Sequence, residues 1–411
     1  MPELLAPAGN REKLEAAIRF GADAVYFSGQ VFGMRASAAN FSSEELISAV
    51  KYAHEHGVLA YITVNTMPRE SEYEILKSYF KNVISVAKPD ALIVADIGVL
   101  TLARELLPGI ALHLSTQANA LSSAACRAWA SLGVKRIVLA RELSLAEIKT
   151  IRQNLPKEIE LEAFIHGSMC ISYSGRCLLS NFFTSRDANR GQCTQPCRWS
   201  YSLHSGDLFL KEEKRPDIPI PMEEHGGETF FMSSRDTCMI DHMDELMTSG
   251  INSFKIEGRM KSAYYTAVTT NTYRMAIDAW KKGESTPNPA WRRELESVSH
   301  REYATGYYFG DAQKDANVTM ESGYRKEKAF LAIVEAYDPK TGLALCRQKN
   351  KFSLGDSLEA LTPGFVGQGF IAEALFDGEM HPISSVPHPG MQFYLLCPFA
   401  LHSGDILRAG E

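Results

Sequence analysis

Short, almost uninterrupted apolar segments alternate with amphipathic ones through the first part of the chain. Runs without regular polar alternation are typical of parallel strands buried on both faces. Eight such strands separated by helices predict a (β/α)8 barrel of the TIM type. An open doubly wound sheet is the alternative, but its usual nucleotide-binding glycine motifs are missing from the sequence. The predicted strands are Glu3–Ala8, Ala22–Ser28, Leu59–Asn65, Ala91–Asp96, Ala111–Thr116, Arg136–Arg141, Leu161–Gly167 and Ser253–Gly258.

The amphipathic segments carry recognisable helix ends. Ser42-x-x-Glu45 and Ser144-x-x-Glu147 have the form of capping boxes, in which each side chain satisfies a backbone N–H at the start of the helix. A glycine stands between several helix patterns and the next strand, where a left-handed C-terminal cap favours glycine. These glycines are Gly21, Gly57, Gly133 and Gly250. The pattern therefore predicts short, well-delimited helices between the strands.

The alternation is interrupted once and ends before the C-terminus. We predict that residues 168–240 form a cysteine-rich insertion in a barrel that occupies residues 1–282. A stretch rich in proline and charge then opens a helical or irregular linker over residues 283–326. Residues 327–411 contain short strand patterns between Gly, Pro and Asp turns, which predict a small all-β barrel domain.

Charge and hydropathy exclude several function classes. The 411 residues include 43 Lys and Arg and 49 Asp and Glu, which give a formal net charge of −6. A broad basic surface for nucleic acid is therefore absent, and RNA contact would need a local basic patch. The first residues lack the basic and apolar regions of a signal peptide, and no apolar run approaches the roughly 18 residues of a membrane span. We expect a cytoplasmic protein without membrane partners.

Four of the eight cysteines lie close together in the predicted insertion, with the spacing C-x6-C-x15-C-x3-C. A disulfide framework is not expected in a long chain without a secretory signal. Zinc sites usually have tighter C-x2-C or C-x4-C pairs, and redox or catalytic thiols need only one or two cysteines. Four thiolates on Gly- and Ser-rich loops favour an iron–sulfur site, while the other two interpretations stay open. The cluster is Cys170, Cys177, Cys193 and Cys197, with Cys238 as an alternative fourth ligand.

Polar residues follow the ends of most predicted strands, where the active face of a (β/α)8 barrel is built. Some of them could simply cap helices, as Asp96 could. Glu257 and Arg259 are stronger candidates because they place charged side chains at the end of a buried strand, where they would need partners or a ligand. HExxH and GxSxG motifs of hydrolases are missing. The other candidates at strand ends are Asn65, Gln117, Arg141 and His166, and His166 could pair with a thiolate.

Several motifs together resemble the peptidase U32 (collagenase-like protease) family. The most specific is the stretch 162–180, EAFIHGSMCISYSGRCLLS, and the similarity extends over nearly the whole chain. The other matching stretches are 3–9, 21–26, 255–259 and, near the C-terminus, 349–356. Within this family, residues 191–199 and 113–119 are most similar to the tRNA uridine 5-hydroxylation proteins.

This resemblance implies a specific chemistry. It implies a 4Fe–4S cluster on four cysteines and oxygen-independent, prephenate-dependent 5-hydroxylation of the tRNA wobble uridine. The alternatives that it leaves open are a collagenase-like peptidase, hydroxylation of a ribosomal RNA cytidine or a quinone precursor, and a non-enzymatic cluster-bearing subunit. The implied partners are tRNA, prephenate or a similar dicarboxylate, and an electron donor or a sister subunit of the family.

The resemblance also assigns roles to particular residues. Cys170, Cys177 and Cys193 match cluster ligands, and Cys197 is the expected fourth ligand, with Cys238 as the alternative. We predict that Glu257, Arg259 and His166 are catalytic and that Arg35, Asn65, Gln117 and Arg141 bind substrate. The guanidinium groups would suit a dicarboxylate because they bind carboxylates in a bidentate manner. Lys349 and Lys351 in the β domain could contact RNA phosphate or could be solvated turn residues.

Overall fold

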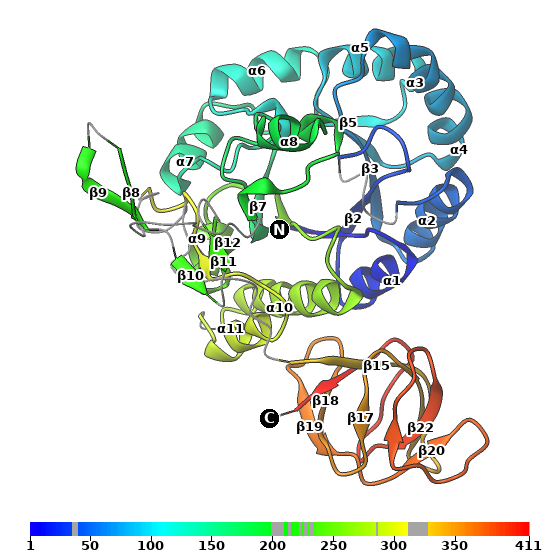
Figure 1. The fold of residues 1–411 in the computed structure, drawn as a ribbon. Helices are drawn as coiled ribbons and strands as arrows, with labels where there is room; N and C mark the ends of the chain where they lie inside the picture. The colour runs from blue at the N-terminus through cyan, green and yellow to red at the C-terminus, as the bar shows by residue number, and fades with distance from the viewer. Residues whose placement is uncertain are drawn as a thin grey trace.

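The computed structural model describes residues 1–34, 40–198, 209–212, 215–221, 223–225, 228–230, 234–284, 287–310 and 328–410. Figure 1 shows a ring of helices around a barrel of strands, with a separate all-β body beside it. Arg35 lies outside the described residues, so its predicted role in substrate binding stays a prediction. In the part of the chain that the structure describes, no helix is both long and apolar enough to cross a membrane.

Eight parallel strands close into a barrel, which confirms the predicted (β/α)8 fold. Each strand pairs with the next, and the last strand pairs with both its predecessor and the first strand. The predicted strands are mostly one to three residues too long at their C-terminal ends, because polar residues there leave the sheet and enter loops. The strands are β1 (Glu3–Pro7), β2 (Ala24–Phe27), β3 (Leu59–Val64), β4 (Ala91–Val94), β5 (Ala111–Leu114), β6 (Arg136–Val138), β7 (Glu160–Ser168) and β13 (Ser253–Ile256).

Helices connect the strands and cover the outside of the barrel (Figure 1). Both predicted capping boxes are present, at the starts of the helices that follow Ser42 and Ser144. The four glycines predicted to end helices all have positive φ angles, between 71° and 97°. The helices are α1 (Arg11–Arg19), α2 (Ser43–Glu55), α3 (Tyr73–Tyr79), α4 (Ser85–Ala87), α5 (Ile97–Leu106), α6 (Ser123–Ser131), α7 (Leu145–Gln153), α9 (Met243–Met247) and α10 (Ala263–Lys281).

The interior of the barrel contains a chain of paired charges. Arg136 Nη1 lies 2.6 Å from Glu3 Oε1 and 3.4 Å from Glu162 Oε2. The other oxygen of Glu162, whose side chain is fully buried, accepts a 2.7 Å hydrogen bond from Lys255 Nζ. Barrel interiors usually hold layers of branched apolar side chains. Here, the buried charges persist because each has an oppositely charged partner.

The cysteine-rich insertion leaves the barrel at the end of β7 and returns beside the same strand. Its last strand, β12 (Asp236–Cys238), runs antiparallel to the C-terminal end of β7, and β14 (Tyr303–Ala304) extends this edge of the sheet. A buried ion pair between Asp236 and Arg301, 2.6 Å apart, fixes the edge. The insertion also contains α8 (Leu179–Thr184), a hairpin of β8 (Phe209–Glu212) and β9 (Arg215–Pro221), and a hairpin of β10 (Glu223–His225) and β11 (Glu228–Phe230).

The C-terminal part is an antiparallel all-β domain, as predicted from its turn-rich sequence. Seven strands form one sheet in the order β19-β18-β23-β15-β16-β22-β20, and β17 pairs with β21. An apolar core between the strands holds this domain together. The strands are β15 (Phe330–Asp338), β16 (Leu343–Gln348), β17 (Phe352–Ser353), β18 (Ser357–Leu361), β19 (Gln368–Ile371), β20 (Leu375–Asp377), β21 (Ser385–Val386), β22 (Gln392–Leu396) and β23 (Ile406–Ala409).

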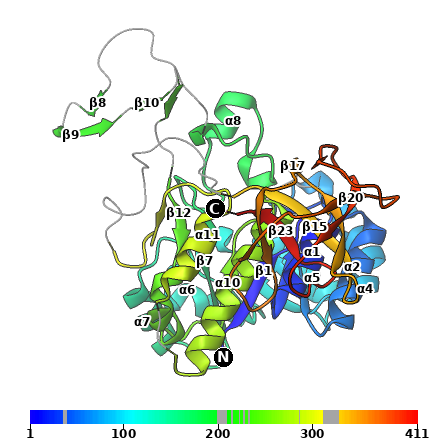
Figure 2. The same cartoon turned by 90° about the horizontal axis from the view of Figure 1, so that it is seen from below.

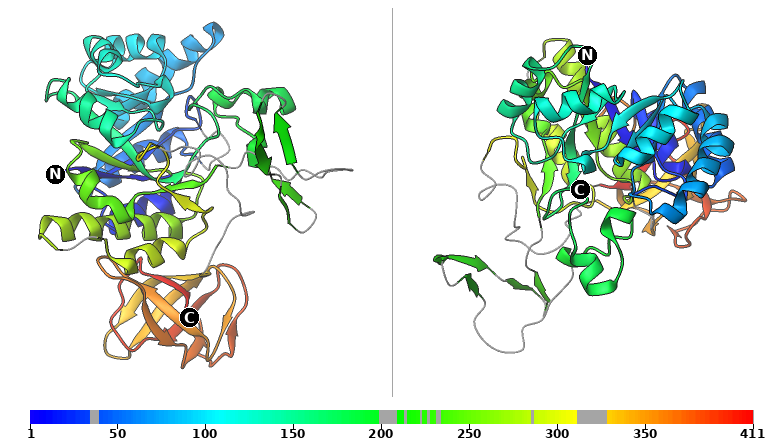
Figure 3. Two further views of the ribbon diagram at one scale, coloured as in Figure 1. Left: turned by 90° about the vertical axis from the view of Figure 1, so that its left-hand side faces the viewer. Right: turned by 90° about the horizontal axis from the view of Figure 1, so that it is seen from above.

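Ion pairs join the β domain to the barrel side of the molecule, and Figure 3 shows the two parts side by side. Arg408 is almost fully buried and lies 2.7 Å from both Glu294 of α11 (Pro289–Glu296) and Glu359. Lys349 Nζ donates a 2.9 Å hydrogen bond to Glu12 of α1. Lys349 therefore contacts the barrel, and its predicted contact with RNA phosphate stays a prediction. Because these contacts cross the domain boundary, they favour a fixed arrangement of the two domains.

Candidate functional site

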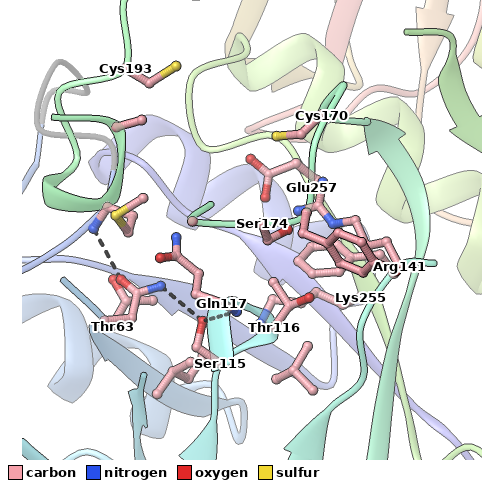
Figure 4. A pocket seen from close by; sticks show the side chains of 18 of the residues that line it. Thr63, Ser115, Thr116, Gln117, Arg141, Cys170, Ser174, Cys193, Lys255 and Glu257 are labelled. Atoms are coloured by element: carbon pink, nitrogen blue, oxygen red, sulfur yellow. Dashed lines mark hydrogen bonds between the residues drawn. The ribbon is translucent and has the colours of Figure 1, made fainter. Parts of the chain in front are cut away.

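A cavity of about 100 Å³ lies at the end of the barrel where the parallel strands terminate, and we call it the mouth cavity. It is enclosed by residues that follow several barrel strands and by the first part of the insertion. Figure 4 shows Cys170 and Cys193 above residues from the strand ends, including Gln117. The predicted candidates that line it are Asn65, Gln117, Arg141, Cys170, Cys177, Cys193, Glu257 and Arg259. Sequence reasoning therefore identified residues that lie far apart in the chain but meet at one site.

A network of hydrogen bonds positions the barrel side of the mouth cavity. Asn65 accepts a hydrogen bond from the backbone N–H of Met34 and donates one to Ser115 Oγ, at 3.1 and 3.3 Å. Arg259 Nη1 donates to Thr63 Oγ1 at 3.2 Å. These bonds join loops that follow different strands, so the side chains are held in place before any ligand binds.

Two buried polar atoms of the mouth cavity have no hydrogen-bond partner. They are Gln117 Oε1, an acceptor, and Arg141 Nε, a donor. Arg141 Nη1 donates a hydrogen bond to the backbone oxygen of Ser168, and the guanidinium lies 4.0 Å from the ring centre of Phe164. Buried polar atoms are almost always paired, so unpaired ones in a cavity indicate a position for a polar ligand or water. With Arg259 also present, the cavity favours an anionic ligand.

The four clustered cysteines surround a second cavity of about 260 Å³, which we call the thiol cavity. Cys170, Cys177, Cys193 and Cys197 all line it, and Cys170, Cys177 and Cys193 are free thiols. Glu257 and three of these cysteines also line the mouth cavity, so the two cavities adjoin. The thiol groups thus lie directly beside the candidate substrate-binding residues.

The thiol arrangement distinguishes between the kinds of group that could bind there. A single zinc ion needs its sulfur ligands about 2.3 Å from one point. In the described ranges, no group of three His, Cys, Asp or Glu side chains is placed to hold a single metal ion. A multi-iron cluster is itself several ångströms wide, and its cysteine ligands stand around it rather than at one point. Four cysteines around one cavity fit such a cluster better than a single ion.

Cys238 and His166 lie apart from both cavities. Cys238 is buried in the barrel core with its sulfur 3.9 Å from the hydroxyl of Tyr273, and burial raises the pKa of its thiol to about 11. His166 is paired with Cys238 in the β7–β12 register and is enclosed by the rings of Tyr265, Tyr273 and Tyr303. Neither residue lines the mouth cavity or the thiol cavity. The position of His166 favours a structural role over the predicted catalytic one.

The burial of His166 makes the stability of the protein sensitive to acid. Burial lowers the pKa of His166 to about 3, whereas a histidine in the unfolded chain has a pKa near 6.5. At a pH between these two values the histidine is protonated in the unfolded chain but not in the folded protein. The free energy of unfolding, which has its full value above pH 6.5, therefore falls by about 1.4 kcal/mol for each pH unit below it. From pH 7 to 5, wild type should lose about 2 kcal/mol more unfolding free energy in urea than His166→Gln. Equal losses in wild type and in His166→Gln would contradict this prediction. The control is His388→Gln, which replaces an exposed histidine.

Several residues of the mouth cavity were not predicted from the sequence. One of them is Lys255, which belongs to a recognised motif and lines the cavity. Its Nζ is bonded to Glu162 and lies 4.4 Å from the ring centre of Tyr26. The Tyr26 hydroxyl donates to the backbone oxygen of Ile256 and contacts Glu257 Oε2 at 3.3 Å. Both residues lie within buried strands. Their orientation depends on the strand register, which the sequence pattern alone does not give.

Comparisons with known proteins agree with this architecture. Residues 9–318 match the family described as Peptidase family U32, and residues 326–408 match the Peptidase family U32 C-terminal domain. The chain is 36% identical over 417 residues to tRNA hydroxylation protein P1 of Bacillus subtilis, with 100% of this chain and 95% of that protein covered.

Two further relatives have other names. A 23S rRNA 5-hydroxycytidine synthase of Escherichia coli is 37% identical over 277 residues, which cover 67% of this chain and 39% of that protein. A collagenase of Porphyromonas gingivalis is 30% identical over 374 residues, with 88% of this chain and 86% of that protein covered. The match of both domains shows that the chain belongs to peptidase family U32.

Proposed function

We propose that this chain is an RNA-modifying iron–sulfur enzyme that hydroxylates carbon 5 of the wobble uridine in tRNA without molecular oxygen. The observation that carries the proposal is that four cysteines surround a cavity adjoining a mouth cavity suited to anions. The relative that spans the whole chain is named for tRNA hydroxylation, which supports tRNA as the substrate. A ribosomal RNA cytidine is the alternative, supported by the name of the Escherichia coli relative.

Cys170, Cys177, Cys193 and Cys197 would hold a 4Fe–4S cluster in the thiol cavity. Such a cluster supplies electron transfer, or a Lewis-acidic iron where one iron has an open position. Glu257 lines both cavities, so its carboxylate can accept the proton that carbon 5 of the base loses. The tightly packed barrel residues below it keep bulk water away from the reacting atoms.

The reaction also needs a second substrate. Exchanging the hydrogen on carbon 5 for a hydroxyl group withdraws two electrons from the base, so the reaction needs an oxygen source and a two-electron acceptor. We propose that prephenate, a dicarboxylate with a ring hydroxyl group, serves as both: its ring C–O bond breaks, the oxygen passes to carbon 5, and the ring carbon takes up the two electrons and the proton that carbon 5 loses. Arg141 and Arg259 would bind its carboxylates, and Gln117 Oε1 would accept a hydrogen bond from its hydroxyl group.

A peptidase is the second candidate function, supported by the name of the Porphyromonas gingivalis relative. Cysteine and serine peptidases need a base, most often a histidine, within hydrogen-bond reach of the nucleophile. No histidine is among the described residues that line the mouth cavity or the thiol cavity. This geometry favours RNA modification over peptide hydrolysis.

Nucleoside mass spectrometry of a strain that lacks the gene tests the proposal. Digested tRNA from the deletion strain should lack 5-hydroxyuridine derivatives, and a plasmid copy of the gene should restore them. If these nucleosides survive in a strain that also lacks any second family member, the proposal fails. Loss of a hydroxycytidine from ribosomal RNA alone would instead support the alternative substrate. Gelatin cleavage by the purified protein would favour the peptidase.

Replacing Arg259 with alanine should strongly reduce the modification while leaving the thiol cavity intact. A charge-assisted hydrogen bond to a carboxylate contributes about 1.5–3 kcal/mol, so we expect the ratio of 5-hydroxyuridine to uridine to fall at least tenfold in the complemented deletion strain. Iron content should match wild type, because Arg259 does not line the thiol cavity. The control is Arg127→Ala, an exposed arginine far from the mouth. Undiminished hydroxylation in Arg259→Ala would exclude the proposed carboxylate contact.

A further inference from the structure

An exposed apolar surface lies next to the thiol cavity, on and beside α8. The exposed fractions of Leu178, Phe182 and Phe183 are 76%, 80% and 49%. Figures 1 and 2 show α8 on the mouth side of the barrel, projecting outward from it. Large apolar side chains exposed together on a surface mark interaction sites. We call Leu178, Phe182 and Phe183 the α8 platform.

The α8 platform is held rigidly to the cysteine-bearing segment. Ser180 is fully buried at the inner face of α8, and its hydroxyl lies 3.0 Å from both the backbone nitrogen and the hydroxyl oxygen of Thr194. Thr194 directly follows Cys193, and α8 begins two residues after Cys177. The platform is therefore anchored through Ser180 to Thr194, the neighbour of Cys193, and through the chain to Cys177, and both cysteines line the thiol cavity. Phe182, the more exposed of its two phenylalanines, remains accessible to a ligand.

A third cavity, of about 400 Å³, adjoins the α8 platform, and we call it the arginine cavity. Arg69, Arg176 and Arg190 line it together with Leu178 of the platform. Gly175, Cys177 and Ala188 line both this cavity and the mouth cavity, so the two are continuous. The arginine cavity therefore lies between the platform and the mouth cavity.

The charge around the arginine cavity is positive in a protein whose net charge is −6. Two of its arginines pair with carboxylates: Arg190 binds both oxygens of Glu72 at 2.8 Å, and Arg69 lies 3.4 Å from Asp187. Arg176 Nε donates a hydrogen bond to the neutral side chain of Asn119, so a carboxylate does not neutralise this contact. This cavity therefore has the local positive charge that RNA binding requires in an acidic protein.

We propose that the α8 platform and the arginine cavity bind a single-stranded RNA loop, with a base stacked on Phe182 and the backbone phosphates at Arg176. This inference rests on the proposed function and names the surface through which the RNA substrate is held. Proteins that bind unpaired RNA combine exposed aromatic rings, on which bases stack, with cations that contact phosphate. A loop held on the platform can place an unstacked base in the mouth cavity, which is continuous with the arginine cavity.

Binding of a fluorescein-labelled anticodon stem-loop RNA with uridine at the wobble position tests this proposal. The full chain, reconstituted with iron and sulfide, is titrated in fluorescence anisotropy. We expect Phe182→Ala to weaken binding between about five- and a hundredfold, the range measured for loss of base stacking. Phe182→Trp should keep wild-type affinity because its ring also stacks. Arg176→Ala should weaken binding and reduce the slope of log affinity against log salt by about one.

The matched control is Phe365→Ala, which removes an equally exposed ring from the β domain. Equal RNA affinity of wild type and Phe182→Ala would overturn the inference. Light scattering gives a second outcome that would overturn it. If wild type is a dimer and Phe182→Ala is a monomer with the same RNA affinity, the platform binds a second copy of the chain instead.

The same variants separate this inference from the proposed function. If the deletion strain loses 5-hydroxyuridine and Phe182→Ala restores it fully, only the platform proposal fails. If a strain that also lacks any second family member keeps the modification, the proposed function fails, whereas weaker RNA binding by Phe182→Ala would still support the platform as an RNA-binding surface. Iron content equal to wild type in each purified variant shows that the cysteine-bearing segment is intact.

Discussion

A chain with alanine at both Cys170 and Cys177 is expected to purify without iron and to leave its RNA unmodified. These two residues line both the mouth cavity and the thiol cavity, so they lie between the proposed cluster and the proposed substrates. A cubane cluster with only two protein thiolates left is not retained, and the broad absorption near 400 nm that wild type should show after anaerobic purification should vanish. Complementation of the deletion strain with this variant should restore no hydroxylated nucleoside.

The control for this prediction is Cys126→Ala, which removes a buried cysteine of α6 remote from both cavities. It should keep the iron and the modification. Iron bound at wild-type stoichiometry in the double variant would contradict the cluster proposal. A colourless wild-type protein that still hydroxylates RNA would contradict it as well.

The identity of the fourth cluster ligand is tested by a second pair of variants. Cys197 lines the thiol cavity, whereas Cys238 is buried in the barrel core beside Tyr273. Cys197→Ser should therefore lose iron, and Cys238→Ser should keep it while losing some stability from the buried hydroxyl group. The opposite outcome would assign the fourth position to Cys238.

Replacing Arg136 with alanine is expected to cost more stability than loss of any surface charge. Although burial by itself lowers the pKa of Arg136, the carboxylates of Glu162 and Glu3 raise it above its ordinary value. Removal of one partner of a buried ion pair leaves an uncompensated charge and costs about 3–5 kcal/mol. Urea unfolding followed by circular dichroism should show this loss.

Two further variants test whether the loss of stability comes from carboxylates left without their arginine. Arg11→Ala removes an arginine of an exposed pair with Glu15 and should change stability by less than about 1 kcal/mol. Combining Arg136→Met with Glu3→Gln should recover part of the stability that Arg136→Met alone loses, because the buried charge is then removed with its partner. No recovery in the double variant would mean that packing, not charge, dominates at this position.

The sequence predicts the barrel well because its periodicity is strong, but it says little about contacts across the barrel. The polar residues at strand ends converge on one cavity because parallel strands all end at the same face. The pairing of Glu162 with Lys255 could not be predicted, because it depends on the register that brings β7 and β13 side by side. Glu162 and Lys255 lie in strands that the sequence predicts, but neither was predicted to be a site residue.

The insertion was the hardest part to interpret from sequence. β12 has only three residues, too few for a periodic pattern, so its return beside β7 was not predicted. That return explains why Cys238 and His166 lie in the core, since the antiparallel register places them opposite each other. The clustered cysteines were identified correctly as one group because their spacing in sequence is short, and a cavity joins them.

The position of β13 has a consequence for how the chain matures during synthesis. β13 closes the barrel by pairing with both β1 and β7, yet it is made only after the whole insertion has left the ribosome. Until then β1 and β7 are open edges, which attract chaperones and favour aggregation. Part of the thiol cavity wall, which includes Glu257, Gly258, Met260 and Lys261, is also made after the four cysteines. Loading with iron and sulfide should therefore follow completion of the barrel, and nascent chains that stop before residue 253 should be degraded without acquiring iron.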